Sequence, residues 1–277
     1  MELEAYEKRG YLLEDFRLFH LRDTEMESVD WHYHTFHKII FFLSGQAAYD
    51  IEGQRYALEP GDVLLVGRGD IHRPEVESGV PSERVIGYIS PAFLRAQSRP
   101  DCDLEACFAM ARQEFRFVLR PAARRSRLPP ILTAFEQSLI AGGFGQTLLS
   151  QSLFLQLLIE VSRGVLEHDL SYVTNAAYDE KTVAILQYLN ANLTEPISID
   201  DLAARFYISK YYMMRRFRQE TGYTIHSYLV GKRLLLAREL IAGGMAITEA
   251  CYQSGFQDYS TFSRAYKKQF GHTPREA

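Results

Sequence analysis

The last third of the chain contains one pattern twice: a short helix, a tight turn and a second helix rich in arginine and lysine. The first copy runs from Leu202 to Arg218 and the second from Ala250 to Lys268. In each copy apolar residues recur at helical spacing, and basic residues occupy the opposite face of the second helix. A helix-turn-helix has this layout and presents its second helix to the major groove of DNA. The repeat therefore predicts two DNA-binding units in one chain.

The second helix of each unit should pack one face inward and turn the other toward DNA. Met213 and Phe217 are four residues apart and share a face, so we expect both to be buried. Arg215 and Arg264 hold equivalent positions early in their helices, where an arginine can donate two hydrogen bonds to guanine. The other residues predicted to touch bases or phosphates lie on the same arcs: Lys210, Tyr211, Met214, Arg218, Tyr259, Ser260, Ser263, Lys267 and Lys268.

The distribution of charge agrees with DNA binding although the formal net charge is −4. From Asp179 onward the chain has 13 Lys and Arg against 10 Asp and Glu, whereas the first 178 residues have 18 against 25. Arg218, Lys267 and Lys268 lie late in their helices, which favours contacts with phosphates over contacts with bases. The first basic helix holds four cations with no acid between them: Lys210, Arg215, Arg216 and Arg218. Such clustering matters more for DNA binding than the overall balance.

The first part of the chain has the pattern of a small β-structure. From Phe16 to about Ser90, short β-rich runs alternate with turns that contain glycine or proline, which predicts a sandwich or small barrel. The predicted strands are Ile39–Leu43, Ala47–Ile51, Arg55–Leu58, Val63–Val66 and Val85–Ile89.

Helical periodicity replaces this pattern after Pro91, and the predicted helices are Asp103–Leu119, Pro130–Ala141 and Gln146–Glu167. The last of these is apolar around much of its circumference, so it can be a core helix or a surface that meets a second copy of the chain. We expect an α+β protein with an effector-sensing and dimerisation domain over 1–168, a linker over 169–179 and an all-α DNA-binding domain over 180–277.

Residues 180–274 resemble the DNA-binding domain of the AraC/XylS family. The resemblance rests on Gly255-Phe256, on Phe262-Ser263-Arg264 and on the run Lys267–Pro274, which is close to the signature of that family. It implies two helix-turn-helix units that enter successive major grooves. By position, the base-contacting sites of the family fall on Tyr211, Met214, Arg215, Tyr259, Ser260, Ser263 and Arg264. Met214 departs from the usual polar residue, so the first helix can contact a thymine methyl group there.

The N-terminal part resembles the cupin barrel that many members of this family contain. The motifs that resemble it are Trp31–His34, Pro60–Val63 and Gly69–His72. Metal-dependent cupins use two histidines, a glutamate and a third histidine, but Lys38 occupies the glutamate position here. Its ammonium group cannot donate a lone pair to a metal while it is protonated.

Three interpretations of the histidines follow, with His37 expected on the outward face of its strand. They can line an effector pocket in which Lys38 pairs with an anionic or polyhydroxylated ligand. They can hold a metal through three imidazoles, or they can be structural. We predict the effector pocket, without a cofactor, and assign its wall to Trp31, His32, His34, Lys38, Tyr49 and His72. The metal alternative involves His32, His34 and His72.

Other classes of function find less support in the sequence. No Ser-His-Asp or Cys-His grouping, P-loop or dinucleotide fingerprint is present, so we expect no enzymatic activity, with a metal-binding cupin enzyme or a ligand-independent DNA binder as the alternatives. The three cysteines show no metal-ligand spacing, the acidic start is not a signal sequence, and no apolar run could span a bilayer. We therefore expect a cytoplasmic homodimer whose partners are double-stranded DNA, a small-molecule effector and RNA polymerase, with no membrane contact.

Overall fold

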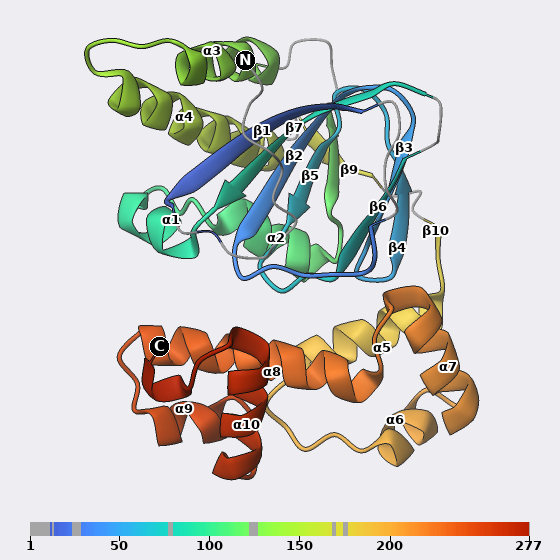
Figure 1. Ribbon diagram of the computed structural model, residues 1–277. Coiled ribbons are helices and arrows are strands. Elements are labelled where there is room, and N and C mark those ends of the chain that lie inside the picture. Colours follow the sequence, from blue (N-terminus) through green and yellow to red (C-terminus); the bar gives the residue numbers. More distant parts are fainter. Residues whose placement is uncertain are drawn as a thin grey trace.

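The computed structural model describes residues 12, 14–23, 29–76, 80–121, 127–167, 170–173 and 177–276. It has the expected α+β organisation, with an open cupin-like pair of antiparallel sheets followed by helices and then an all-α part (Figure 1). None of the described helices combines the length and the apolar character needed to cross a membrane.

Two sheets form the N-terminal part, and their neighbouring strands are antiparallel. The six-stranded sheet has the order β1 (Phe16–Asp23), β7 (Ser82–Ile89), β2 (His37–Ser44), β5 (Val63–Val66), β8 (Val118–Pro121) and β9 (Leu170–Tyr172). The four-stranded sheet has the order β10 (Ala177–Tyr178), β4 (Gln54–Ala57), β3 (Ala47–Ile51) and β6 (His72–Val76). The two sheets face each other and leave the barrel open. The predicted strands are confirmed, with bounds that agree within a few residues.

The six-stranded sheet is covered on both faces, which explains the unbroken apolar run in its central strand. Ile39, Ile40, Phe41 and Phe42 are all buried in β2, whereas a strand exposed on one side would alternate apolar and polar residues. The helices that cover its outer face are α1 (Pro91–Gln97), α2 (Ala106–Glu114), α3 (Leu128–Ile140) and α4 (Gln146–Leu166) (Figure 1).

One predicted helix is too long. The expected span Asp103–Leu119 contains α2 and then strand β8, because the chain leaves the helix at Phe115, whose φ is +53°. A left-handed residue ends the helix, and Val118 and Leu119 then pair with β5. The apolar run at this point is a buried strand, which periodicity alone cannot distinguish from a helix.

The segment expected to connect the two domains also takes part in the sheets. Strand β9 pairs with β8, and strand β10 pairs with β4, so that each of the two sheets gains an edge strand. Short pairings of this kind tie the connection to the barrel on both sides of residues 174–176.

The C-terminal part consists of α5 (Glu180–Ala191), α6 (Ile199–Arg205), α7 (Lys210–Thr221), α8 (Ile225–Ala242), α9 (Ile247–Gln253), α10 (Tyr259–Phe270) and a final 3₁₀ turn, Pro274–Glu276. The α6–α7 and α9–α10 pairs are the two predicted helix-turn-helix units, and α8 runs between them (Figure 1). Ser209 caps α7 and Asp258 caps α10, each through a side chain that accepts a backbone N–H.

The end of α7 packs against the N-terminal part at Gly222. This glycine has φ of +73°, and a Cβ atom added to it would lie 2.5 Å from two atoms of the Trp31 ring. Tyr223 also donates a hydrogen bond from its hydroxyl to the carbonyl of Trp31, at 3.4 Å. The position therefore requires glycine for its backbone conformation and for the close approach of the indole.

Gly222→Ala should lower the free energy of unfolding by about 1–2 kcal/mol through backbone strain alone, with an additional loss from the overlap with Trp31. The measurement is urea denaturation followed by circular dichroism. Gly244→Ala is the matched control, since Gly244 has φ of +90° and no neighbouring atom within 4 Å of an added Cβ. Equal losses in the two variants would show that Trp31 does not pack on this turn.

Candidate DNA interface and barrel site

The second helix of the first unit, α7, has the two faces that the sequence predicts. Met213 and Phe217 are buried in the core of the C-terminal part. Tyr211 is 73% exposed and Met214 is 45% exposed, and Arg215 is exposed beside them. These exposed side chains are accessible to a binding partner.

The second helix of the second unit, α10, repeats the arrangement. Its core face is Phe262, Tyr266 and Phe270, all buried. Arg264 is exposed and donates from Nε to the carbonyl of Ser260 at 3.3 Å, which holds the guanidinium against its own helix. Among the other predicted contacts on α10, Ser260, Lys267 and Lys268 are exposed. Tyr259 and Ser263 are half-buried.

The basic cluster of α7 is divided between two surfaces. Lys210 is exposed and forms an ion pair with Asp200 of α6, and Arg218 is exposed. Arg216 instead pairs with Asp179 at 3.4 Å and with Glu220 at 3.0 Å. Arg216, which is not among the predicted DNA contacts, is therefore held at the junction with the barrel by two carboxylate partners.

Sequence reasoning missed Tyr207 in the turn between α6 and α7. It is 91% exposed and has φ of +52°, a conformation that Gly255 adopts in the corresponding turn of the second unit. An exposed aromatic residue in a strained turn beside a DNA-facing helix is a functional candidate. A non-glycine residue with positive φ leaves no reliable signal in a sequence, which explains the omission.

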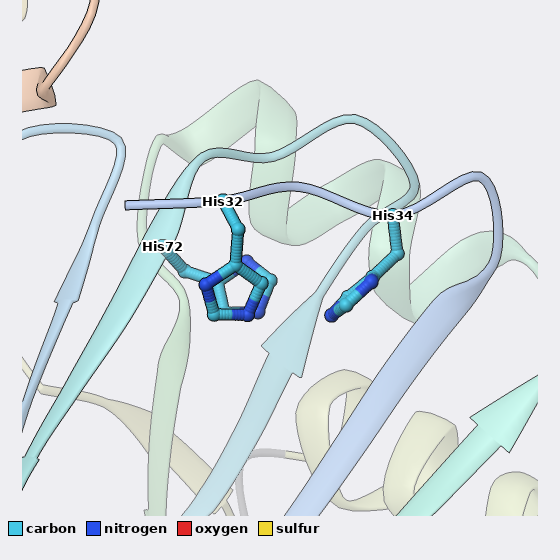
Figure 2. Close-up of side chains that lie close together, drawn as sticks. All are labelled: His32, His34 and His72. Atoms are coloured by element: carbon cyan, nitrogen blue, oxygen red, sulfur yellow. The ribbon is translucent and has the colours of Figure 1, made fainter. Parts of the chain in front are cut away.

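The three histidines of the predicted sensor site meet inside the barrel. His32 and His34 lie on the segment before β2, and His72 begins β6 (Figure 2). The ring centroids are 4.3 Å apart for His32 and His72, 4.9 Å for His32 and His34, and 5.1 Å for His34 and His72. A backbone bridge between His32 and His72 joins the two segments in both directions, with N–O distances of 3.1 and 2.9 Å.

The electrostatic environment keeps these imidazoles neutral. Burial, assisted by the positive charge of Lys38, lowers the pKa of His32 to about 4 and that of His34 to about 2. The same two causes hold the pKa of His72 well below its usual value. Burial and the nearby Arg84 lower the pKa of Lys38 itself to about 7. The site therefore holds uncharged nitrogen donors beside one buried amine.

The other predicted wall residues occupy different surroundings. Lys38 is buried and donates from Nζ to the hydroxyl of Tyr49 at 3.2 Å, so these two residues lie together in the barrel. Trp31 is half-buried against Gly222, and the guanidinium of Arg73 lies 4.7 Å from its ring centroid. His37 points away from the histidine cluster and is buried under α2, where it contacts Phe108.

A buried polar network joins the barrel to α8, the helix between the two DNA-binding units. Glu52 is 1% exposed and accepts hydrogen bonds from Tyr228 at 2.8 Å and from Nζ of Lys232 at 2.9 Å. The backbone N–H of Ile71 also donates to Glu52, at 2.9 Å. Because Ile71 precedes His72, the carboxylate connects the histidine cluster with α8 through a single residue. No motif marks Glu52 in the sequence.

The loop that leads to His72 is held by a second carboxylate. Asp70 accepts from the backbone of Gly67 at 2.8 Å and from Arg112 of α2 at 2.5 Å, and Nζ of Lys232 lies 3.7 Å away. The negative charge of Asp70 raises the pKa of Arg112. Arg68, in the same loop, forms an ion pair with Glu239 of α8. Charged contacts thus fix residues 67–72 to both α2 and α8.

A cavity of about 620 Å³ lies between α2 and α5, outside the barrel. His37, Arg68, Glu105 and Phe108 line one side of it, and Asn190 lines the other. It is large enough for a small organic molecule and is a candidate for effector binding outside the barrel.

Comparison with known proteins agrees with both halves of the structure. An AraC-like ligand binding domain model matches residues 16–158, and a helix-turn-helix domain model matches residues 202–277. The chain is similar to the HTH-type transcriptional activator RhaS of Escherichia coli O139:H28, with 27% identity over 251 residues that cover 88% of this chain and 86% of RhaS.

Two solved structures are also similar to the chain. ToxT from Vibrio cholerae shares 15% identity, with coverage of 95% of this chain and 97% of ToxT and a TM-score of 0.36. The DNA-binding domain of AdpA, solved in complex with a target DNA, shares 26% identity over 34% of this chain and 85% of that domain, with a TM-score of 0.33. Because the ligand-binding model alone spans more than half of the sequence, the chain belongs to the AraC family of DNA-binding transcriptional regulators with an N-terminal ligand-binding domain.

Proposed function

We propose that the barrel binds a small organic anion or a polyhydroxylated compound and that binding changes how α7 and α10 engage DNA. One observation carries the proposal: the segment Trp31–His34 touches both halves of the molecule. His32 and His34 turn into the barrel, whereas Trp31 packs on Gly222 and the hydroxyl of Tyr33 lies against Gly231 of α8. Alternate residues along an extended segment point in opposite directions, so a shift at the histidines also moves the two aromatic side chains.

The energy for this regulation comes from a difference in effector affinity between two arrangements of the halves. In the first, the Glu52–Lys232 and Arg68–Glu239 pairs hold α8 against the barrel, as described above. In the second, these contacts are weakened and the two DNA-binding units reorient. Couplings of this kind are about 1–3 kcal/mol, or about 5- to 150-fold in affinity.

We assign the base contacts to Tyr211, Met214, Arg215 and Arg264 and the phosphate contacts to Arg218, Lys267 and Lys268. Exposure of these side chains on α7 and α10 supports the assignment. With α8 as a rigid connection, the two helices would enter major grooves about 10 bp apart. We further propose that the protein acts as a regulator without enzymatic activity, in the cytoplasm, with DNA and RNA polymerase as its partners.

We also propose a homodimer that forms through the α3–α4 hairpin. The core-facing side of α4 is buried at Phe154, Leu157 and Leu158, whereas the end of α3, the turn and the start of α4 expose large apolar side chains. These side chains are Leu139, Ile140, Phe144, Leu148 and Leu149. Exposed apolar patches of this kind mark interaction sites, and a second copy of the same helix offers a complementary surface.

Fluorescence anisotropy with a selected operator tests the effector proposal across a panel of sugars and organic acids. We expect one class of compound to change the dissociation constant for DNA by about 5- to 150-fold. Lys38→Met should abolish this response and keep the effector-free affinity, because the amine contacts the ligand inside the barrel and belongs to neither α7 nor α10. An unchanged affinity across the panel would favour a ligand-independent DNA binder.

A further inference from the structure

The geometry points to a metal site: we propose that His32, His34 and His72 bind one divalent transition-metal ion, with zinc as the probe that suits them best. One ligand nitrogen from each residue lies within 4.8 Å of the other two, and the three rings converge on one point (Figure 2). Zinc–nitrogen distances of about 2.0–2.1 Å place tetrahedral ligands about 3.4 Å apart, so small rotations of the rings close the site.

Backbone carbonyls already orient two of the ligands. Nδ1 of His32 lies 2.7 Å from the carbonyl of Asp30, and Nδ1 of His72 lies 2.9 Å from the carbonyl of Asp70. A carbonyl oxygen can only accept, so Nδ1 carries the proton in both rings and the lone pair is on Nε2. Metal-binding histidines have this same outer partner, which fixes the tautomer and the direction of the ring.

The inward nitrogens have no other partner within the described part of the chain. Nε2 of His72 and both ring nitrogens of His34 are buried without a hydrogen bond. Residue exposure is 0% for His72 and 6% for His34. Buried polar atoms are nearly always paired, and a purely structural cluster would leave these three unsatisfied. A metal ion bound to one nitrogen of each ring would satisfy Nε2 of His72 and one of the two His34 nitrogens.

A metal ion held by three histidines would keep one coordination position for an exogenous ligand. Three protein ligands leave one position of a tetrahedral zinc site open. Lys38 stands where a carboxylate ligand would be expected, and its Nζ is bonded to Tyr49 at 3.2 Å. A metal ion beside a buried amine attracts an oxyanion, so the fourth ligand is a carboxylate or similar oxygen of the effector. This last step rests on the proposed function of the barrel, whereas the metal site does not.

Metal content of the tag-free full-length protein tests the inference. After incubation with Zn²⁺ and exhaustive dialysis, inductively coupled plasma mass spectrometry should find one zinc ion per chain. His34→Gln and His72→Gln should each weaken zinc binding at least about tenfold, the lower bound seen for the loss of an outer partner alone. His226→Gln is the matched control, because His226 is exposed on α8 and should leave the zinc in place.

Cobalt supplies a readout on the wild-type protein itself. Co²⁺-loaded wild-type protein should show the intense visible absorption of a tetrahedral site with nitrogen ligands, and acetate should shift this spectrum. Absence of bound zinc in the wild type, or equal zinc in wild type and His34→Gln, would overturn the metal site. An acetate-insensitive spectrum would overturn the open position. DNA affinity is measured separately, so failure of the regulator proposal is distinguishable from failure of this one.

Discussion

Arg264→Ala should weaken binding to a selected operator by about 5- to 150-fold, equivalent to about 1–3 kcal/mol, and should remove the preference at one base pair. The reason is that Arg264 lies early in α10, is exposed, and donates only to a carbonyl of its own helix among the contacts of the described residues, so DNA can displace this contact at little cost. Arg215→Ala should have the same effect at a base pair about one helical turn away. Competition binding with a library of single-base operator variants measures both changes.

Lys267→Ala is the matched control for the arginines. Lys267 lies one turn after Arg264 on the same exposed arc of α10, toward the end of the helix. A phosphate contact contains no sequence information, so its loss should weaken all operator variants alike and reduce the slope of log K against log salt by about 1. Equal, sequence-blind losses from Arg215→Ala, Arg264→Ala and Lys267→Ala would contradict the assigned roles.

Lys232→Ala should destabilise the protein by about 3–5 kcal/mol, because it leaves the Glu52 carboxylate buried without its charged partner. Lys232 is 8% exposed and Glu52 is 1% exposed, so water cannot replace the lost contact easily. The free energy of unfolding from urea titration measures the effect. If Lys232→Ala costs less than about 1 kcal/mol, the two halves are not held together by this pair.

The double variant Glu52→Gln, Lys232→Met separates stability from coupling. Removing both charges together avoids an unpaired buried ion and should recover most of the stability lost in Lys232→Ala. The network nevertheless joins the loop before His72 to α8, so the double variant should bind operator while its response to effector is reduced. A full effector response in a stable double variant would mean that the signal passes elsewhere.

The C-terminal units were predictable because their information is local. Periodicity predicts that Met213 and Phe217 lie in the core, and both are buried. Polar caps and turn glycines mark where the helices begin and end, and the exposed arcs follow from the same 3.6-residue repeat. The resemblance to a known family reinforced what the periodicity already indicated.

Other features depend on contacts that are remote in the sequence. Glu52 bonds to Lys232 across 180 residues, and Arg216 bonds to Asp179 across 37. In the sequence, a carboxylate in a turn and an arginine in a basic helix have the pattern of solvated charges. Only the three-dimensional structure shows the ion-pair partner of each. Strand β8 was missed for a similar reason, because only the pairing with β5 makes its apolar run a strand. The unpaired nitrogens of His34 likewise become visible only when every neighbour is known.

Hydroxyl-radical footprinting of the protein on its selected operator tests the central claim most directly. If α7 and α10 engage DNA as two units joined by α8, protection should appear as two patches on one face of the duplex, about 10 bp apart. Arg215→Ala should lighten only one patch and Arg264→Ala only the other. A single protected patch, or two patches on opposite faces of the duplex, would contradict the account.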